Sequence, residues 1–150
     1  MNRRIFLIPF TTVLMSFAFN NTHAQHVGKQ VISSPNAPEA IGPYSQAIKS
    51  GKTVYLSGQI AIDPKTKQVV ANASIEDQTR LVLENLKAVL AADGLTMDSI
   101  VSATVFLTDL TDFAKMNEVY ATYFKNAATR RGPIVRLANW AFCIVSAHFG

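Results

Sequence analysis

The side chains that commonly carry out chemistry are few in this chain and widely spread. The single cysteine, Cys143, has no histidine at a spacing that suggests a nucleophile pair, and it lies in an apolar run. We therefore expect an inert buried thiol, and one cysteine excludes an intramolecular disulfide. The histidines are His23, His26 and His148, near the two ends, so a metal site is not indicated. Phosphate-binding glycine loops, HExxH and GxSxG are absent from the sequence.

Two segments have the apolar periodicity of a helix and would position any site. The first begins at Ser74, whose spacing to Asp77 is that of a capping box, and Gly94 suits the position after its end. Its apolar residues fall on one side: Ile75, Val82, Leu83, Leu86, Val89 and Leu90. The second begins at Thr111 or Asp112. Its expected buried stripe is Phe113, Met116, Tyr120 and Phe124.

The segment before the first helix combines a loop and two strands. Residues 32–43 contain three prolines and read as an extended loop. Residues 52–59 are rich in β-branched and aromatic side chains, which predicts a strand. A turn at 63–67 is followed by a short predicted strand at 68–70.

The remaining strands complete the expected sheet. Residues 99–107 alternate, and the apolar odd positions predict one core-facing side. These odd positions are Val101, Ala103, Val105 and Leu107. Two last strands are predicted at 134–137 and 141–149. These elements predict an α+β domain with two helices packed on one face of a mixed sheet. The other face would be exposed in a single copy, which favours oligomerisation.

Composition and charge exclude several classes of protein. The chain has 150 residues, 49% of them hydrophobic and 16% charged, which excludes a disordered chain. Its formal net charge is +4, but the charge is unevenly distributed. Residues 25–124 carry eight basic and ten acidic side chains, or −2, and residues 125–150 carry four basic side chains and no acid. No clustered basic face is predicted in 25–124, so nucleic acid is not the expected partner.

The first 24 residues have the three-part form of a secretory signal peptide. Arg3 and Arg4 precede a largely apolar run at 5–19, and Thr22–Ala24 offers small residues for cleavage. The alternative is an uncleaved anchor, but the run is shorter than the ~20 residues of a membrane span and Pro9 interrupts it. We therefore expect a single mature domain at 25–150, in a bacterial periplasm or secreted, with no membrane attachment after cleavage.

Several stretches resemble one family closely. The first reads AIGPYSQA at residues 40–47, and the second reads VYLSGQI at residues 54–60, followed by Asp63-Pro64. Residues 78–94, 105–110 and 113–124 continue the similarity. On these motifs the chain is identified as a member of the YjgF/YER057c/UK114 superfamily, the reactive intermediate deaminases (Rid), over about residues 28–126.

The resemblance implies a fold and an activity. The fold would be the chorismate-mutase-like α+β sandwich, assembled as a homotrimer with its sites in clefts between subunits. The implied activity is a hydrolase reaction. Reactive enamines and imines, such as 2-iminobutanoate and 2-iminopropanoate, are converted to 2-oxo acids and ammonia. The deaminase needs no cofactor and no metal, and its partner is a small imino acid.

The resemblance also implies roles for individual residues. Tyr44 would close the cleft over the substrate, Ser57 and the backbone amide of Gly58 would form its floor, and Asn117 would border it. Each has a structural alternative: Tyr44 could pack, Ser57 could satisfy the strand, and Asn117 could be a polar residue on the helix surface.

The end of the chain departs from the family pattern. The family has Pro-Ala-Arg after its second helix, whose arginine clamps the substrate carboxylate, and a later glutamate that helps activate water. Here Arg130 and Arg131 precede Pro133 at an altered spacing, and either could replace the clamp. Glu118 is the last glutamate, so no catalytic residue is assigned in the tail, residues 127–150. A reading-frame shift near residue 128 and true divergence both remain open. So do a non-catalytic trimeric binding or chaperone-like module and the ribonuclease activity ascribed to some relatives.

Overall fold

A computed structural model of the chain describes residues 28–70, 72–124, 134–137 and 143–148. The strands are β1 (Lys29–Ile32), β2 (Ala47–Ser50), β3 (Thr53–Gln59), β4 (Ile100–Leu107), β5 (Ile134–Leu137) and β6 (Cys143–His148). The helices are α1 (Ile75–Ala91) and α2 (Phe113–Thr122). Short 3-10 turns, η1 (Met97–Ser99) and η2 (Leu110–Asp112), precede β4 and α2. The predicted signal peptide at 1–24 and the pair Arg130 and Arg131 lie outside the described residues.

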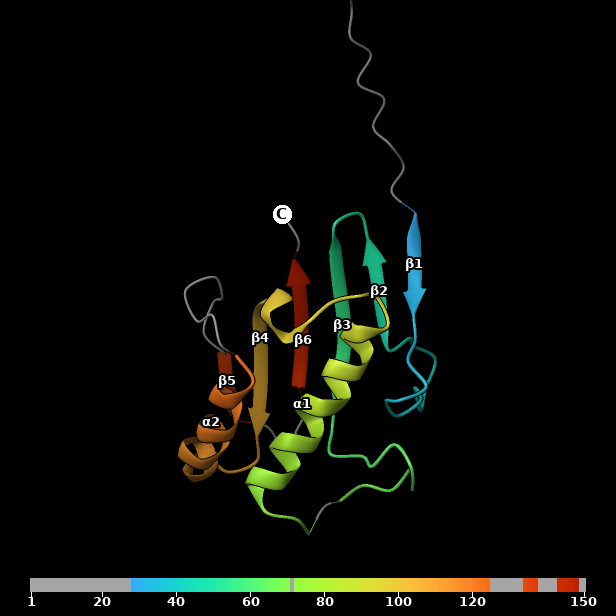
Figure 1. The fold of residues 1–150 in the computed structure, drawn as a ribbon. Coiled ribbons are helices and arrows are strands. Elements are labelled where there is room, and N and C mark those ends of the chain that lie inside the picture. Colours follow the sequence, from blue (N-terminus) through green and yellow to red (C-terminus); the bar gives the residue numbers. More distant parts are fainter. Residues whose placement is uncertain (1–27, 71, 125–133, 138–142, 149–150) are drawn as a thin grey trace, which may run out of the picture.

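The strands form one sheet in the order β1-β2-β3-β6-β4-β5. The β4–β5 pair is parallel and the other described pairs are antiparallel. Both helices lie on the same face of the sheet, α1 near its middle and α2 toward the β4–β5 edge (Figure 1). The predicted α+β class, with two helices on one face of a mixed sheet, is confirmed.

The last strand in the sequence occupies the middle of the sheet (Figure 1). Leu56 of β3 and Ala103 of β4 both have Val145 of β6 as their register partner, from opposite sides. β6, in the atypical tail, therefore joins β1-β2-β3 to β4-β5. The strands predicted at 134–137 and 141–149 are confirmed, the second with narrower bounds.

The bounds of helix α1 follow from capping residues at both of its ends. The Ser74 hydroxyl accepts a hydrogen bond from the Asp77 amide at 3.1 Å, and Glu76 and Asp77 lie in the first turn, where the helix dipole favours negative charge. The helix ends at Ala91, and Gly94 adopts φ +74°, the left-handed conformation that favours glycine after a helix. The predicted N-cap is confirmed.

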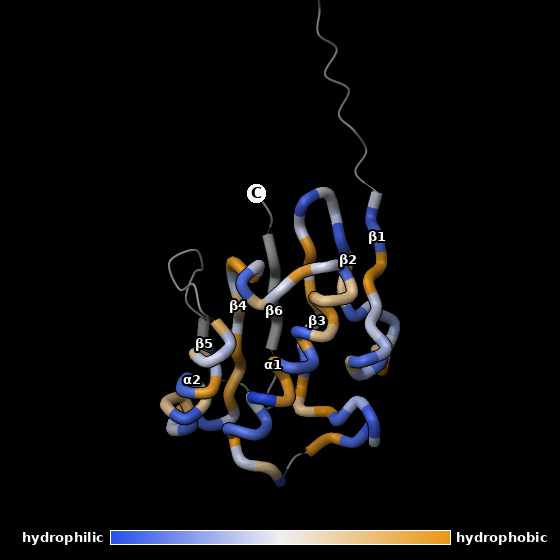
Figure 2. Tube along the Cα trace, in the orientation of Figure 1, coloured by the Kyte–Doolittle hydropathy of each residue, from blue (hydrophilic) through white to orange (hydrophobic). Residues whose placement is uncertain are grey.

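The core lies between the helices and the sheet. Apolar stretches run along β3 and β4 (Figure 2). They meet the inner side of α1, where Leu83, Leu86, Val89 and Leu90 are at most 2% exposed. Asn85 of α1 is equally buried and donates a hydrogen bond to the Ile62 carbonyl at 2.9 Å. That bond ties the segment after β3 to the helix.

Two buried positions were predicted wrongly. Val101 is only half-buried, because the register shifts between Ile100 and Ser102 where β4 pairs with β6, and Ile100 takes the core-facing place. Phe113 is 42% exposed, because the chain enters α2 through η2, and Val119 joins the buried side instead.

The strands before α1 also differ from expectation. β1 and β2 were not predicted: each has four residues, and β1 overlaps the start of the predicted 32–43 loop. The strand expected at 68–70 is reduced to a single bridge between Ile62 and Val69. Short strands depend on pairing with distant partners, so their sequences carry little signal of their own.

The face of the sheet opposite the helices carries an apolar row. Val31, Ile48 and Tyr55 are register partners across β1, β2 and β3. Val31 is 63% exposed and Tyr55 is 55% exposed. We call these three residues the open-face row. Within the described part of the chain, no helix has both the length and the apolar character needed to cross a membrane.

Candidate functional site

A pocket of about 270 Å³ lies between the loop before β2 and the end of β3. One wall is formed by residues 38–41, Tyr44 and Gln46, and the other by residues 58–60 and Ile62. We call it the Tyr44 pocket. Its walls are largely apolar, as in small-molecule sites, and its volume is slightly below the ~300–1,000 Å³ that is usual for them.

Tyr44 stands at this pocket with half of its surface exposed. Its phenol oxygen accepts a hydrogen bond from the Ile41 amide at 3.3 Å, and its own amide donates to the Gly42 carbonyl at 2.8 Å. The ring lies against Gly42: a Cβ atom there would be 3.1 Å from Tyr44 Cε1. Glycine at position 42 therefore leaves the space that the ring occupies.

Ser57 and Gly58 lie at the end of β3, but only Gly58 lines the pocket. The Ser57 amide donates to the Gln46 carbonyl at 2.9 Å, and the Ser57 hydroxyl donates to the Ser45 carbonyl. The hydroxyl proton of Ser57 is thus engaged with the backbone of the neighbouring segment, while its oxygen remains able to accept.

Asn117 is not brought to this pocket within one chain. It is exposed on α2, which lies toward the β4–β5 edge, whereas the Tyr44 pocket lies on the β2–β3 side (Figure 1). Tyr44 and Gly58 therefore come together in the described structure, Ser57 lies beside them, and Asn117 lies apart.

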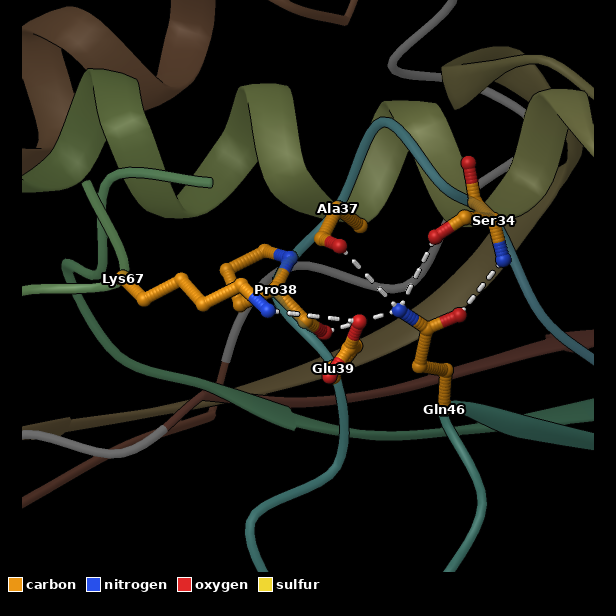
Figure 3. A network of polar contacts seen from close by, with 6 residues as sticks. All are labelled: Ser34, Ala37, Pro38, Glu39, Gln46 and Lys67. Carbon is orange, nitrogen blue, oxygen red and sulfur yellow. Dashed lines mark hydrogen bonds and ion pairs between the residues drawn. The ribbon is translucent and has the colours of Figure 1, made fainter. Parts of the chain in front are cut away.

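Two buried glutamines at the pocket were not singled out from the sequence. Gln46 is 5% exposed, and its carboxamide bonds to the backbone of residues 34–38 (Figure 3). Gln59 is 8% exposed and lines the same pocket. Both fall inside the motifs AIGPYSQA and VYLSGQI, so the available signal was a long polar side chain in a segment otherwise predicted to be apolar or extended.

The charges around the pocket are few. Glu39 is the only acidic or basic side chain among its described lining residues, and its carboxylate lies 3.5 Å from the Lys67 ammonium. Among the described residues, no three His, Cys, Asp or Glu side chains are grouped so as to hold a metal ion. The apolar walls and the backbone groups suit a small, partly apolar ligand.

The shifted pKa values belong to groups away from the pocket. Burial, and then a hydrogen bond to Glu84, raises the pKa of Tyr123 to about 12. The Thr111 backbone amide, followed by the Thr111 side chain, lowers the pKa of Asp109. Both groups lie near the ends of α2, and neither lines the Tyr44 pocket.

Comparison with known proteins places this chain in one family. The sequence model of the endoribonuclease L-PSP family matches residues 34–138. The chain belongs to this family, which includes the YjgF and Rid proteins, so the resemblance drawn from the motifs is confirmed. The match also extends past residue 126, to the end of the β5 region.

Relatives and solved structures agree with this placement. A RutC family protein of Pyrococcus horikoshii is 54% identical over 103 residues, which are 69% of this chain and 81% of the relative. Reactive Intermediate Deaminase A of Arabidopsis thaliana is 46% identical over 108 residues, 72% of this chain and 57% of the relative. The crystal structure of Escherichia coli TdcF with bound serine superposes with a TM-score of 0.69 at 36% identity, covering 81% of this chain and 99% of that one.

Proposed function

We propose that this protein hydrolyses reactive 2-imino acids and their enamine forms, such as 2-iminopropanoate and 2-iminobutanoate, to 2-oxo acids and ammonia. The observation that carries the proposal is the Tyr44 pocket, which lies within the residues that match the family model, 34–138. Relatives of the chain are named reactive intermediate deaminases. A deaminase of this kind belongs to the hydrolases.

Hydrolysis of the imine requires the protein mainly to position the substrate and a water molecule. Water adds to the C=N carbon, the resulting carbinolamine loses ammonia, and a C=O group remains, so that imine and water balance oxo acid and ammonia. We propose that Tyr44 closes over the substrate, that Ser57 and the Gly58 amide form the floor, and that no cofactor or metal is needed. The substrate carboxylate calls for a bidentate arginine, for which Arg130 and Arg131 are the candidates.

We further propose a homotrimer in the chorismate-mutase-like arrangement. The open-face row leaves an apolar strip on the sheet, and covering it in an assembly would remove that strip from water. Asn117 and the Tyr44 pocket, apart in one chain, would border one cleft if they came from different subunits. The mass in solution, measured by light scattering, tests this: a monomer at working concentration contradicts it.

The location of the protein is a separate proposal. Residues 1–24 have the form of a signal peptide, so we propose export to the periplasm or the exterior, with a mature domain at 25–150. N-terminal sequencing of the protein from a cell envelope fraction should begin near Gln25. An intact N-terminus starting at Met1 would contradict export by cleavage.

One observation favours a second candidate, a non-catalytic trimeric module that binds a small ligand. The sequence holds no glutamate after Glu118, so the carboxylate that the family uses to activate water has no counterpart. Such a module would retain the Tyr44 pocket and bind imino or amino acids without turnover.

An assay of turnover and binding separates the two candidates. The imine is generated in situ by an amino-acid oxidase, and ammonia or oxo-acid release is compared with and without the purified protein. Acceleration supports the deaminase. Serine, the ligand in the TdcF structure, serves as the binding probe by calorimetry. Binding without acceleration favours the module.

The tail arginines are tested separately. Arg130→Ala and Arg131→Ala are compared at equal protein concentration, and loss of turnover in one identifies the clamp. If neither variant loses activity, both assignments are withdrawn.

A further inference from the structure

We propose that Gln46 is a positioning residue for the Tyr44 pocket: its buried carboxamide holds the 34–38 turn and thereby sets the wall that contacts the ligand. The kinetic test of this inference rests on the proposed deaminase function. The structural test, by amide hydrogen exchange, does not. Gln46 acts through the backbone around it, so it is not assigned a catalytic role.

The carboxamide is engaged on both of its polar atoms (Figure 3). Its oxygen accepts a hydrogen bond from the Ser34 amide, and its nitrogen donates to the Pro38 carbonyl at 2.7 Å. The same nitrogen lies 3.2 Å from the Ser34 carbonyl and 3.4 Å from the Ala37 carbonyl. Two N–H groups thus serve three backbone carbonyls, and one side chain joins the residue before β2 to the whole turn.

The geometry makes this turn dependent on Gln46. Ser34 and Pro38 are buried, so backbone groups released there would lose their partners away from water. Within the turn itself, one backbone hydrogen bond is present, from the Ala37 amide to the Ser34 carbonyl at 3.4 Å, which is long. The side chain of Gln46 therefore supplies the shorter contacts.

An ion pair also connects the loop before β2 to the rest of the chain, and it is weaker than the contacts of Gln46. Glu39 and Lys67 join the loop to the segment after β3, but their charged groups are 3.5 Å apart and both side chains are more than two-thirds exposed. Exposed pairs of this kind are screened by water and salt. Gln46, at 5% exposure, is the buried side-chain contact that holds Pro38 at the pocket, and the Tyr44 phenol oxygen holds the Ile41 amide further along the same wall.

The test uses three variants of the full chain. Gln46→Leu removes all of the polar contacts. Gln46→Glu keeps an acceptor, and when protonated its carboxyl can accept from Ser34 and donate to Pro38. Gln30→Glu makes the same chemical change at an exposed position of β1 and is the matched control.

The kinetic readout is the KM for 2-iminopropanoate relative to wild type, measured at several pH values. We expect KM to rise about tenfold or more at pH 7.5 in Gln46→Leu and Gln46→Glu, because small displacements of binding groups carry large penalties, while kcat changes less. In Gln46→Glu the ratio should fall toward one as the pH is lowered, because burial favours the neutral carboxyl, and in Gln46→Leu it should stay constant. A KM within twofold of wild type in both variants overturns the proposal.

The structural readout is amide hydrogen exchange, which needs no turnover. Exchange of the Ser34 amide should accelerate in both Gln46 variants at neutral pH, while amides of α1 and β4 keep their wild-type rates. Uniform acceleration would mean general destabilisation and would contradict a local role. If the wild-type protein shows no deaminase activity, the proposed function fails, and the exchange result still decides the role of Gln46.

If the Gln46 variants do not fold, the proposal is tested by hydrogen exchange of the wild-type chain. Saturating serine should slow exchange of the Ser34 amide more than that of β4 amides, because a ligand in the pocket stabilises the wall that Gln46 holds. Serine binding without slower exchange at Ser34 would overturn the proposal.

Discussion

Replacing Gly42 by alanine tests how Tyr44 is placed. The added Cβ would lie 3.1 Å from Tyr44 Cε1 and 3.3 Å from Cδ1, closer than ordinary van der Waals contact, so the ring must move by a few tenths of an ångström. Gly42 is not among the residues with positive φ, so the substitution brings no left-handed backbone strain. The perturbation therefore acts mainly on the tyrosine ring.

The expected magnitude follows from the hydrogen bond that holds the ring. The distance from the Ile41 amide to the Tyr44 phenol oxygen is already 3.3 Å, at the long end of the useful range, so a shift of a few tenths breaks the bond. A neutral hydrogen bond contributes about 0.5–1.5 kcal/mol, which corresponds to a loss of about 2- to 12-fold in kcat/KM. Thermal stability should change little, because Tyr44 is half exposed.

The assay compares turnover of 2-iminopropanoate and exchange of the Ile41 amide in Gly42→Ala and in Gly28→Ala. Gly28 is the matched control, since a Cβ there meets nothing within 4 Å. In a Tyr44→Phe background, Gly42→Ala should cost much less than in wild type, because the bond it breaks is already absent. An equal loss in both backgrounds, or faster Ile41 exchange in the Gly28 control, would refute this account of the ring.

Three further predictions concern stability. Leu86→Ala should lower the free energy of unfolding by about 2–5 kcal/mol in urea denaturation, because Leu86 has no exposed surface, and a loss below 1 kcal/mol would contradict the packing described. Gly94→Ala should cost about 1–2 kcal/mol by the same measurement, because φ is +74° while nothing crowds the new Cβ; an unchanged midpoint would contradict that conformation. In an absorbance titration, Tyr123 should ionise near pH 12, after burial and Glu84 have raised its pKa, and Tyr123→Phe should remove that step. Because a raised pKa favours the neutral form of the folded protein, this contribution to stability is complete below pH 10 and is lost as the pH rises toward 12.

Local signals in the sequence were sufficient for the helices and the longest strands. The α1 N-cap at Ser74, its buried side and the alternation of 103–107 all depend on residues within a few positions of each other, and the structure agrees with them. The errors occur where distant segments decide. The bulge that turns Val101 away depends on the pairing of β4 with β6, while β2 forms as a partner of β3 and β1 as a partner of β2.

The candidate site divides in the same way. The motifs that contain Tyr44 and Gly58 could be recognised in the amino-acid sequence alone. The structure brings these two residues to one pocket. The role of Gln46 was not recognisable, because a glutamine is ordinarily a surface residue, and only the approach of the 34–38 turn gives its amide buried partners. Asn117, which the motifs also suggested, is exposed on α2 and does not line this pocket.

The sequence by itself determined the family, the α+β class and the position of the helices, because capping, periodicity and motif identity are properties of neighbouring residues. Only the tertiary structure shows that part of the atypical tail lies in the middle of the sheet. β6 lies between β3 and β4, although it is the last strand in the chain. Strand order and burial arise from contacts between residues far apart in sequence, whose free energy exists only once the chain has folded. The same reason makes Gln46 a buried residue and Phe113 an exposed one.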